Sequence, residues 1–350
     1  MKKLFVWTLR LLGITAAMFA AFLGYLTLTD YRPVPIESIA VEGPALPTTP
    51  KDTLSILTWN IGYAGLSAHE DFFFDGGEGV RAHRDTVISN LQAIQRFLAE
   101  AQDDFLFVQE IDLGSKRSYY LQQMDSLKKA LPAYGASFAL NYHSRFVPQP
   151  FLNPMGRVKA GLASFGKYTP SISQRFALAP DADWPVGLFM LDRCFLSWHF
   201  PIGENKNLVL INVHLSAYDD GTVKQQQLDT LSAYLLALQN EGHEVVVGGD
   251  WNMFPTGYQP KLPESSHLTP KSAPVDYPAM GWRWIHPGET TNRWLDIPYT
   301  AGKTTENILD YFLVSPGINV IDIERIDLRF RHSDHQPVRL RFSWSSPALQ

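Results

Sequence analysis

The sequence has almost no cysteine, since Cys194 is the single thiol among 350 residues. One cysteine cannot form an internal disulfide, so an exported form of this chain would depend on its hydrophobic core for stability. The sequence also lacks a Cys/His spacing that suits a closed zinc site, a fixed repeat and a long low-complexity tract. These absences argue against a zinc module, a repeat protein and a disordered chain. The composition, with 45% hydrophobic and 19% charged residues, is that of a globular protein.

An excess of basic residues is also missing. The formal net charge is −5, and removing the three cations Lys2, Lys3 and Arg10 from the count leaves about −8 for the rest. A surface of this sign repels polyanions and argues against tight, non-specific binding of nucleic acid. A local basic patch is compatible with it.

The N-terminus contains the one long apolar run, from Leu11 to Leu28, and basic residues precede it. A run of this length can just span a bilayer, whereas the apolar core of a cleaved signal peptide is usually shorter. We therefore predict a signal-anchor transmembrane segment over residues 1–29, with a cleaved signal peptide as the alternative. The positive flank should stay in the cytoplasm, so the remainder is expected outside the inner membrane, or secreted if cleavage occurs.

Residues 30–52 contain five prolines and are predicted to be a linker. No internal boundary is visible after it, which predicts one catalytic domain over residues 53–345. Apolar residues at helical spacing predict helices over 83–101, 118–131 and 223–240. Between 137 and 169, prolines and glycines break the pattern, and only 161–165 reads as a short strand.

Several predicted strands end in a polar side chain. The clearest is the buried run 245–250, which closes with two glycines and Asp250 and is followed by Asn252. Three others end in Asn60, Glu110 and His214, which close the runs 54–60, 105–110 and 208–214. In α/β sheets ligands gather beyond the carboxyl ends of strands. A single Asp at such a place often only caps a turn, but the repetition favours a site.

Two further segments add candidates. The run 307–314 predicts a strand with Asp310 in its middle, and Asp334 with His335 precedes a last alternating strand over 338–344. Carboxylate and amide oxygens suit Mg²⁺, which keeps its remaining waters. Hydrolysis of a phosphoester needs such a cation together with a base that activates water. A histidine beside carboxylates can be that base once its tautomer is fixed.

These segments resemble the motifs of the endonuclease/exonuclease/phosphatase superfamily, which is deoxyribonuclease I-like. The resemblance rests on TWNIG, VQEID, NVHL, GDWN, LDYFLVS and SDHQPV, which hold the polar residues named above and occur in the family's order over residues 54–344. It implies an α/β protein, a four-layered α/β/β/α sandwich with two central mixed sheets. It also implies a metal-dependent phosphoric ester hydrolase.

The resemblance implies a role for each residue. Glu110 is expected to be the principal ligand of Mg²⁺, for which Mn²⁺ is a possible substitute, with Asn60 and Asp334 beside it. His335, oriented by Asp310, is expected to act as general base or to hold the phosphate. The other catalytic residues are Asp250, which orients or deprotonates the attacking water, and Asn252 with His214, which bind phosphate oxygens. The family assigns the proton to Asp250 in some members and to His335 in others.

The substrate class is less determined, because one fold and metal site serve unrelated substrates. Nucleases of this kind are expected to have basic residues beside the site, and the candidates are Lys116, Arg117, Arg145, Arg157, Lys159 and Lys167. The membrane segment, the acidic charge and the aromatic loop at 72–74 favour a small or lipid-derived phosphoester, diester or monoester. The alternatives are an extracellular or periplasmic endonuclease that acts on nucleic acid, and a non-catalytic binding module. The loop at 72–74 is expected to pack onto the domain, with a lid or a membrane-touching tip as alternatives.

Overall fold

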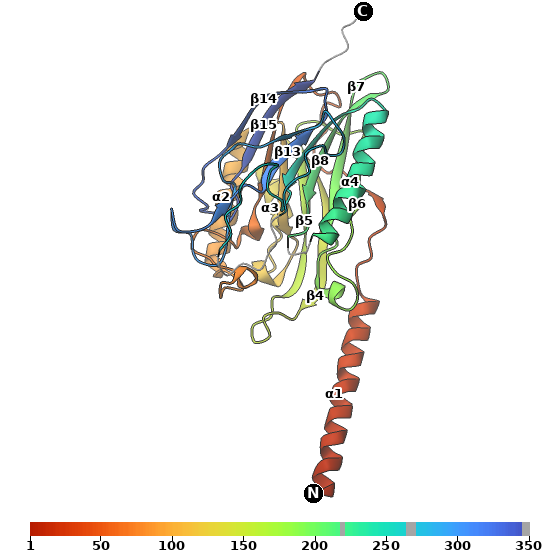
Figure 1. Cartoon of the computed structure of the whole chain (residues 1–350), viewed down its shortest axis with the longest axis vertical. Helices are drawn as coiled ribbons and strands as arrows, with labels where there is room; N and C mark the ends of the chain where they lie inside the picture. The colour runs from red at the N-terminus through yellow and green to blue at the C-terminus, as the bar shows by residue number, and fades with distance from the viewer. Residues whose placement is uncertain (218–220, 264–270, 345–350) are drawn as a thin grey trace, which may run out of the picture.

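Two mixed β-sheets lie face to face at the centre of the molecule, and one long helix projects from its end (Figure 1). The structure is a computed structural model that describes residues 1–217, 221–263 and 271–344. Residue 345, where the predicted domain ends, lies outside the described residues.

The first sheet has seven strands. In spatial order they are β1 (Ile36–Ser38), β6 (Ile172–Ala177), β7 (Cys194–Gly203), β8 (Lys206–His214), β9 (Glu244–Asp250), β13 (Asp310–Val314) and β10 (Arg283–Ile285). The second sheet has six strands. In spatial order they are β14 (Ile318–Arg325), β15 (Val338–Trp344), β2 (Thr53–Asn60), β3 (Phe105–Asp112), β5 (Gly156–Gly166) and β4 (Gly135–Val147). A separate two-stranded ribbon joins β11 (Asn292–Arg293) to β12 (Glu306–Asn307).

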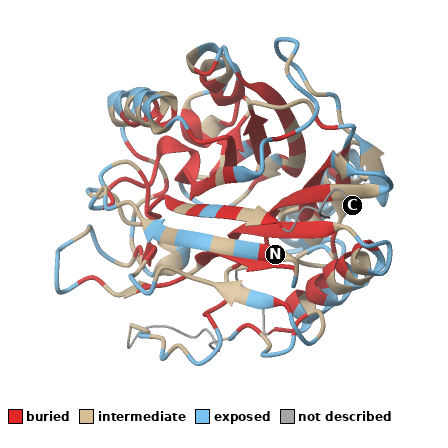
Figure 2. Cartoon of the chain, turned by 90° about the horizontal axis from the view of Figure 1, so that it is seen from above, coloured by how far each residue is buried: buried red, intermediate tan, exposed pale blue. Residues whose placement is uncertain are grey.

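Helices cover the outer face of each sheet. On the second sheet lie α2 (Arg84–Ala101) and α3 (Gln123–Ala130), and on the first lies α4 (Thr222–Asn240). Strand β2 shows how the layers form: Leu54 and Ile56 point into the core between the sheets, while Leu57 and Trp59 point toward the helices. Figure 2 shows the buried residues gathered in the sheets and on the inner sides of the helices. The predicted α/β/β/α sandwich is confirmed.

Two sequence-based predictions of secondary structure need correction in detail. The helix expected over 118–131 begins only at Gln123, because Tyr119 and Tyr120 have positive φ angles of 56° and 62° that end the preceding turn. The region expected to be broken holds β4 and β5, which form a long antiparallel hairpin. Its pattern was hidden because polar residues such as Ser137 and Asn141 are buried in it.

The predicted linker is partly built into the fold. Ile36–Ser38 pairs with β6 as an edge strand, and Glu42 forms a bridge with Ala136 of β4. Only part of residues 30–52 can therefore act as a flexible tether.

Helix α1 (Lys2–Leu28) contains the predicted membrane segment and is long and apolar enough to cross a bilayer. Most of its surface is exposed, and only Leu26 is buried. Its last turns contact the domain at two points. The Phe22 ring lies 6.1 Å from that of Phe146, and the Trp184 indole nitrogen donates to Thr27 Oγ1 at 3.1 Å.

Candidate active site

The predicted site residues meet at one edge of the two sheets because of the strand directions. Strands β2 and β3 are parallel, as are β8 and β9, so their carboxyl ends lie at the same edge. Strands β13 and β15 run antiparallel to β9 and β2 and therefore begin at this edge. Asp310 is consequently the first residue of β13, directly opposite Asp250, and not in the middle of a strand as predicted.

Two local distortions present the acidic residues. At Gly249, φ is +151° and a Cβ atom would lie 2.0 Å from the carbonyl oxygen of Val213, so only glycine lets β9 approach β8 this closely. At the end of β3, the pairing with β5 slips between Val108 and Ile111, and Glu110 has a φ of 57°. This bulge turns Glu110 out of the sheet ladder, which is a common use of bulges beside active sites.

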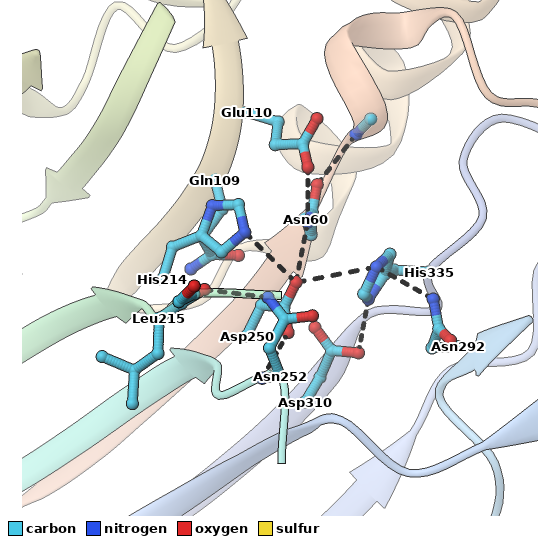
Figure 3. Close-up of polar contacts among 12 residues, drawn as sticks. Asn60, Gln109, Glu110, His214, Leu215, Asp250, Asn252, Asn292, Asp310 and His335 are labelled. Atoms are coloured by element: carbon cyan, nitrogen blue, oxygen red, sulfur yellow. Dashed lines mark hydrogen bonds and ion pairs between the residues drawn. The ribbon is translucent and has the colours of Figure 1, made fainter. Parts of the chain in front are cut away.

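Asp250 is the most contacted of these carboxylates (Figure 3). Its Oδ2 accepts a hydrogen bond from Asn60 Nδ2 at 2.9 Å and lies 3.6 Å from His214 Nε2 and 3.7 Å from His335 Nε2. Its Oδ1 accepts from the Asn252 amide nitrogen at 3.0 Å. Burial raises the pKa of Asp250, but the two histidines and the Asn60 amide lower it below its ordinary value on balance. The carboxylate form is thereby favoured.

His335 and Asp310 form a tight buried pair. The distance from His335 Nδ1 to Asp310 Oδ2 is 2.7 Å, which fixes the imidazole with Nδ1 toward the carboxylate. Burial lowers the pKa of His335, but the charges of Asp310, Asp250 and Asp334 raise it well above its usual value. Burial raises the pKa of Asp310 to about 6 against the opposing effect of His335. Asn292 Nδ2 lies 3.0 Å from His335 Nε2 and holds the other side of the ring.

Asn60 contacts the carboxylates through its nitrogen. Asn60 Nδ2 donates to Asp250 and, at 3.3 Å, to Glu110 Oε1, while its Oδ1 accepts from the Gly62 amide. An amide turned in this way orients the two carboxylates. The predicted role of Asn60 as a ligand would use Oδ1, which here faces the backbone.

Glu110 and Asp334 could hold a divalent cation. Glu110 is the more open of the two, with 25% of its side chain exposed, and its Oε2 lies 4.0 Å from Arg117. Burial raises the pKa of Asp334 to about 6, against the opposing charge of His335 and together with the negative charge of Glu110. Two hard oxygen donors whose charges repel each other fit a cation such as Mg²⁺.

A second group of potential ligand atoms lies within 4.8 Å in the described residues, on Asp250, Asp310 and His335. The 2.7 Å hydrogen bond already engages His335 Nδ1 with Asp310. This cluster is therefore better suited to proton transfer than to binding a cation.

His214 and Asn252 complete the predicted set. Burial, helped by Arg193, lowers the pKa of His214 to about 4 and favours the neutral ring. Asn252 has a φ of 48° and donates through Nδ2 to the Leu215 carbonyl at 3.0 Å. Beneath the site, Gln109 Nε2 donates to Asn212 Oδ1 at 2.7 Å and ties the two sheets together.

A cavity of about 550 Å³ opens over these side chains. Six predicted residues line it, namely Glu110, His214, Asp250, Asn252, Asp334 and His335. Its walls are largely apolar and include Phe72, Phe74, Met155, Phe189 and Trp294. The expected packing of the aromatic loop is thus found for Phe72, which is buried, while Phe74 is 42% exposed.

A protein-family model described as "Endonuclease/Exonuclease/phosphatase family" matches residues 57–335. The chain belongs to this family. The resemblance predicted from the motifs is thereby confirmed, and the chain is a phosphoric ester hydrolase of a metal-dependent class. Membership also favours an enzyme over the non-catalytic binding module.

Solved structures of low sequence identity have the same fold. An endonuclease/exonuclease/phosphatase from Beutenbergia cavernae DSM 12333 aligns with 85% of this chain and 73% of its own, at 16% identity and a TM-score of 0.58. The human nocturnin catalytic domain with bound sulfate aligns over 84% and 94%, at 17% identity and a TM-score of 0.52. ANGEL2, described as a 2′,3′-cyclic phosphatase, aligns over 89% and 99%, at 16% identity and a TM-score of 0.53. No curated protein matches the chain in sequence.

Of the basic candidates for a nuclease of this family, only Arg117 lines the cavity. It is buried and binds Asp112, with Nη2 and Oδ1 3.0 Å apart, and its guanidinium lies 3.8 Å from the Tyr63 ring centroid. Lys116 contacts the carbonyl of Pro154 and Lys167 that of Gln102. Burial and then the charges of Arg145, Lys159 and Arg157 lower the pKa of His143, which lies on β4.

Several residues that line the cavity were not predicted from the sequence, among them Asn292, Arg193 and Lys224. Arg193 pairs with Asp181 at 3.1 Å, and Lys224 Nζ donates to the Asn252 carbonyl at 2.6 Å. None lies at the end of a predicted strand, which was the signal used to find the others. Arg117, Arg193 and Lys224 thus bring positive charge to a cavity that Glu110, Asp250 and Asp334 also line.

Proposed function

We propose that the chain is a membrane-anchored, extracytoplasmic phosphoesterase that uses Mg²⁺, with Mn²⁺ as a possible substitute, to hydrolyse a small or lipid-derived phosphoester. The observation that carries this proposal is the cavity: cations and carboxylates lie at its base, and aromatic and aliphatic residues form its walls. A cavity with such walls suits a substrate that joins a phosphate to an apolar group. Helix α1 supports the anchor by its length and composition.

Glu110 and Asp334 would hold the cation, and Asn60 would orient Glu110. When bound, a divalent cation neutralises the charge that develops on the phosphoryl oxygens. Arg117 Nη2 lies 4.0 Å from Glu110 Oε2 and helps to hold that carboxylate in place. The Arg117–Asp112 pair is therefore a positioning element for the cation site.

Asp250 is assigned to the attacking water. Its Oδ2 accepts a hydrogen bond from Asn60 Nδ2 and faces the ring nitrogens of His214 and His335. These contacts favour the carboxylate form, which is the form that can accept a proton. His335, fixed by Asp310, is assigned to the phosphate, toward which Nε2 can donate. His214 and Asn252 complete the contacts to the phosphate oxygens. Water adds to phosphorus and gives a proton to Asp250, the ester P–O bond breaks, and the leaving alkoxide takes up a proton from solvent, so that the net products are the alcohol and the phosphate.

An endonuclease is the second candidate, because the family to which the chain belongs is described as including endonucleases. Such an enzyme would act on a nucleic-acid phosphate. Of the six basic residues expected for it, only Arg117 lines the described cavity, whose other cations, Arg193, Lys224, Lys271 and Arg293, lie among largely apolar walls. The apolar walls therefore favour the smaller or lipid-derived substrate.

The test uses the purified full chain in detergent, with Mg²⁺ and separately with chelator. The substrates are bis-p-nitrophenyl phosphate, p-nitrophenyl phosphate, a short-chain phosphocholine lipid and plasmid DNA. We expect metal-dependent turnover of the lipid or of a p-nitrophenyl ester, and weak activity on DNA. Robust cleavage of DNA, steeply reduced by salt, with inert lipid and p-nitrophenyl esters would overturn the proposal in favour of the nuclease.

A further inference from the structure

Two neighbouring segments at the α1 end of the domain expose large apolar side chains. Phe151 and Leu152, at the tip of the β4–β5 hairpin, are 90% and 92% exposed. Trp184 and Val186, at the start of the short helix η4 (Val186–Phe189), are 64% and 54% exposed. We call these four side chains the apolar tip. Large apolar side chains that are exposed together at one end of a domain are candidates for a binding surface.

The apolar tip is continuous with the contact that α1 makes with the domain. Phe146, in the strand that leads to the hairpin tip, packs against Phe22 of α1, and Trp184 itself hydrogen-bonds Thr27. In Figure 1 the loop between β4 and β5 extends beyond the point where α1 meets the domain, toward the N-terminal end of α1. Both segments therefore lie on the side from which α1 projects.

The height of this contact on α1 is informative. Phe22 lies six residues before Leu28, which at 1.5 Å per residue is about 9 Å along the helix axis. The hydrocarbon core of a bilayer is about 30 Å thick, so the uncharged run that ends at Leu28 occupies most of it. A side chain that packs on Phe22 consequently lies about 9 Å from the Leu28 end of that run, on its hydrocarbon side, and the hairpin tip extends past it.

Cations lie behind the apolar tip, on the strands of the hairpin. Arg145 and Arg157 are exposed on the two strands of the hairpin, with Lys159 beside them. His143 pairs with Lys159 across the hairpin, and burial and then these three charges lower the pKa of His143. Apolar residues at a tip with Arg and Lys behind them match the order of a bilayer, in which the hydrocarbon lies beneath anionic headgroups.

The same two segments form a wall of the catalytic cavity. Val147, Pro148 and Met155 from the hairpin, and Val186 with Phe189 from the η4 segment, line it. A surface that rests on the bilayer would therefore place the cavity at the headgroup level.

We infer that the apolar tip is a second membrane contact, which docks the domain onto the bilayer that α1 crosses and presents the cavity to a phospholipid within it. The inference rests on the proposed function for the anchor and for phosphoester hydrolysis. The occupant of the surface is the lipid bilayer itself.

The docking test labels the full chain in vesicles of phosphatidylcholine and phosphatidylglycerol. Cys194 is fully buried, so a Leu152→Cys variant offers one reactive thiol for a nitrobenzoxadiazole probe. The control is Ile321→Cys. The Ile321 side chain is 43% exposed and belongs to β14, a strand at the opposite end of the domain from α1 (Figure 1). Protein that floats with the vesicles is selected first. We expect the Leu152 probe to shift to the blue and lose emission to nitroxide-labelled acyl chains, while the Ile321 probe does neither.

The activity test compares Phe151→Asp/Leu152→Asp with Ile321→Asp in the same vesicles. Neither Phe151 nor Leu152 lines the cavity. The double variant is expected to lose about tenfold or more of its turnover of vesicle phospholipid, which corresponds to the loss of one apolar side chain's burial. Turnover of soluble bis-p-nitrophenyl phosphate should be unchanged in both variants.

The outcomes separate the inference from the proposed function. Floated protein with an unquenched Leu152 probe overturns the docking surface while the anchor stands. Failure to float overturns the anchor and the docking inference together, and loss of metal-dependent turnover on every substrate in the wild type overturns the phosphoesterase alone. Turnover of the soluble ester with inert vesicle lipid overturns the phospholipid as substrate, whatever the probe shows.

Discussion

Replacement of Asp310 by Asn tests the role of the His335–Asp310 pair. Asp310 accepts the 2.7 Å hydrogen bond from His335 Nδ1 and is fully buried, yet it does not line the cavity. The change keeps the size of the side chain and removes its charge. We therefore expect it to alter how His335 is held without touching the substrate.

The magnitude follows from the hydrogen bond that is lost. A hydrogen bond to a charged group contributes about 2–3 kcal/mol net. If the transition state depends on it in full, kcat falls roughly 30- to 150-fold. KM should stay within about twofold, because uniform substrate binding is retained. Burial disfavours the charge of Asp310 and raises its pKa to about 6, so removing this charge should leave the Asp310→Asn protein able to fold normally.

The assay is steady-state turnover of bis-p-nitrophenyl phosphate with Mg²⁺, and thermal unfolding verifies the fold. Asp310→Asn is also combined with His335→Ala, since two residues that act as one unit should not have additive effects. An unchanged kcat, or a raised KM with full kcat, would refute the reasoning. Additive losses in the double variant would show that Asp310 acts independently of His335.

Two further predictions concern stability. Gly249→Ala should destabilise the protein by about 3 kcal/mol, because the added Cβ would clash with the Val213 carbonyl oxygen. The control is Gly203→Ala, which should cost little because the nearest atom to the added Cβ is 3.7 Å away. Equal urea midpoints for the two variants would contradict this prediction. Burial lowers the pKa of His199 from 6.5 to about 4. The free energy of unfolding is therefore unaffected by this group above about pH 6.5, and it falls by roughly 3 kcal/mol as the pH falls from there toward 4, because the unfolded chain takes up the proton more readily. In His199→Gln the new side chain can still hydrogen-bond to Tyr234 but does not titrate, so the loss of stability at low pH should be smaller. Urea unfolding at about pH 7 and about pH 4.5 measures this difference. An equal loss in the wild type and in the variant would contradict the assignment to His199.

The site was predictable to the extent that its residues end buried strands. Asn60, Glu110, His214 and Asp250 each follow an apolar run, and parallel pairing alone brings such ends to one edge. The prediction that Asp310 lies in the middle of a strand was wrong, because the apolar pattern over 307–314 continues across the break between β12, which ends at Asn307, and β13, which begins at Asp310.

The missed residues have no such local signal. Asn292 lies on a two-residue strand and reaches His335, 43 positions away, through an isolated bridge. The β4–β5 hairpin was missed because buried polar side chains such as Ser137, and Gly161, whose Cβ would lie 2.2 Å from the Ala139 carbonyl, break its alternation. Tertiary packing decides both features, and a single sequence does not record it.

The most direct test of the central claim measures the binding of Mg²⁺ to Glu110. Calorimetric titration of the full chain with Mg²⁺ is compared for the wild type, Glu110→Gln and the control Glu204→Gln, which changes an exposed carboxylate away from the cavity. We expect Glu110→Gln to lose both the binding heat and the Mg²⁺-dependent hydrolysis of bis-p-nitrophenyl phosphate, while Glu204→Gln keeps both. Undiminished Mg²⁺ binding and turnover in Glu110→Gln would contradict the assignment of this site.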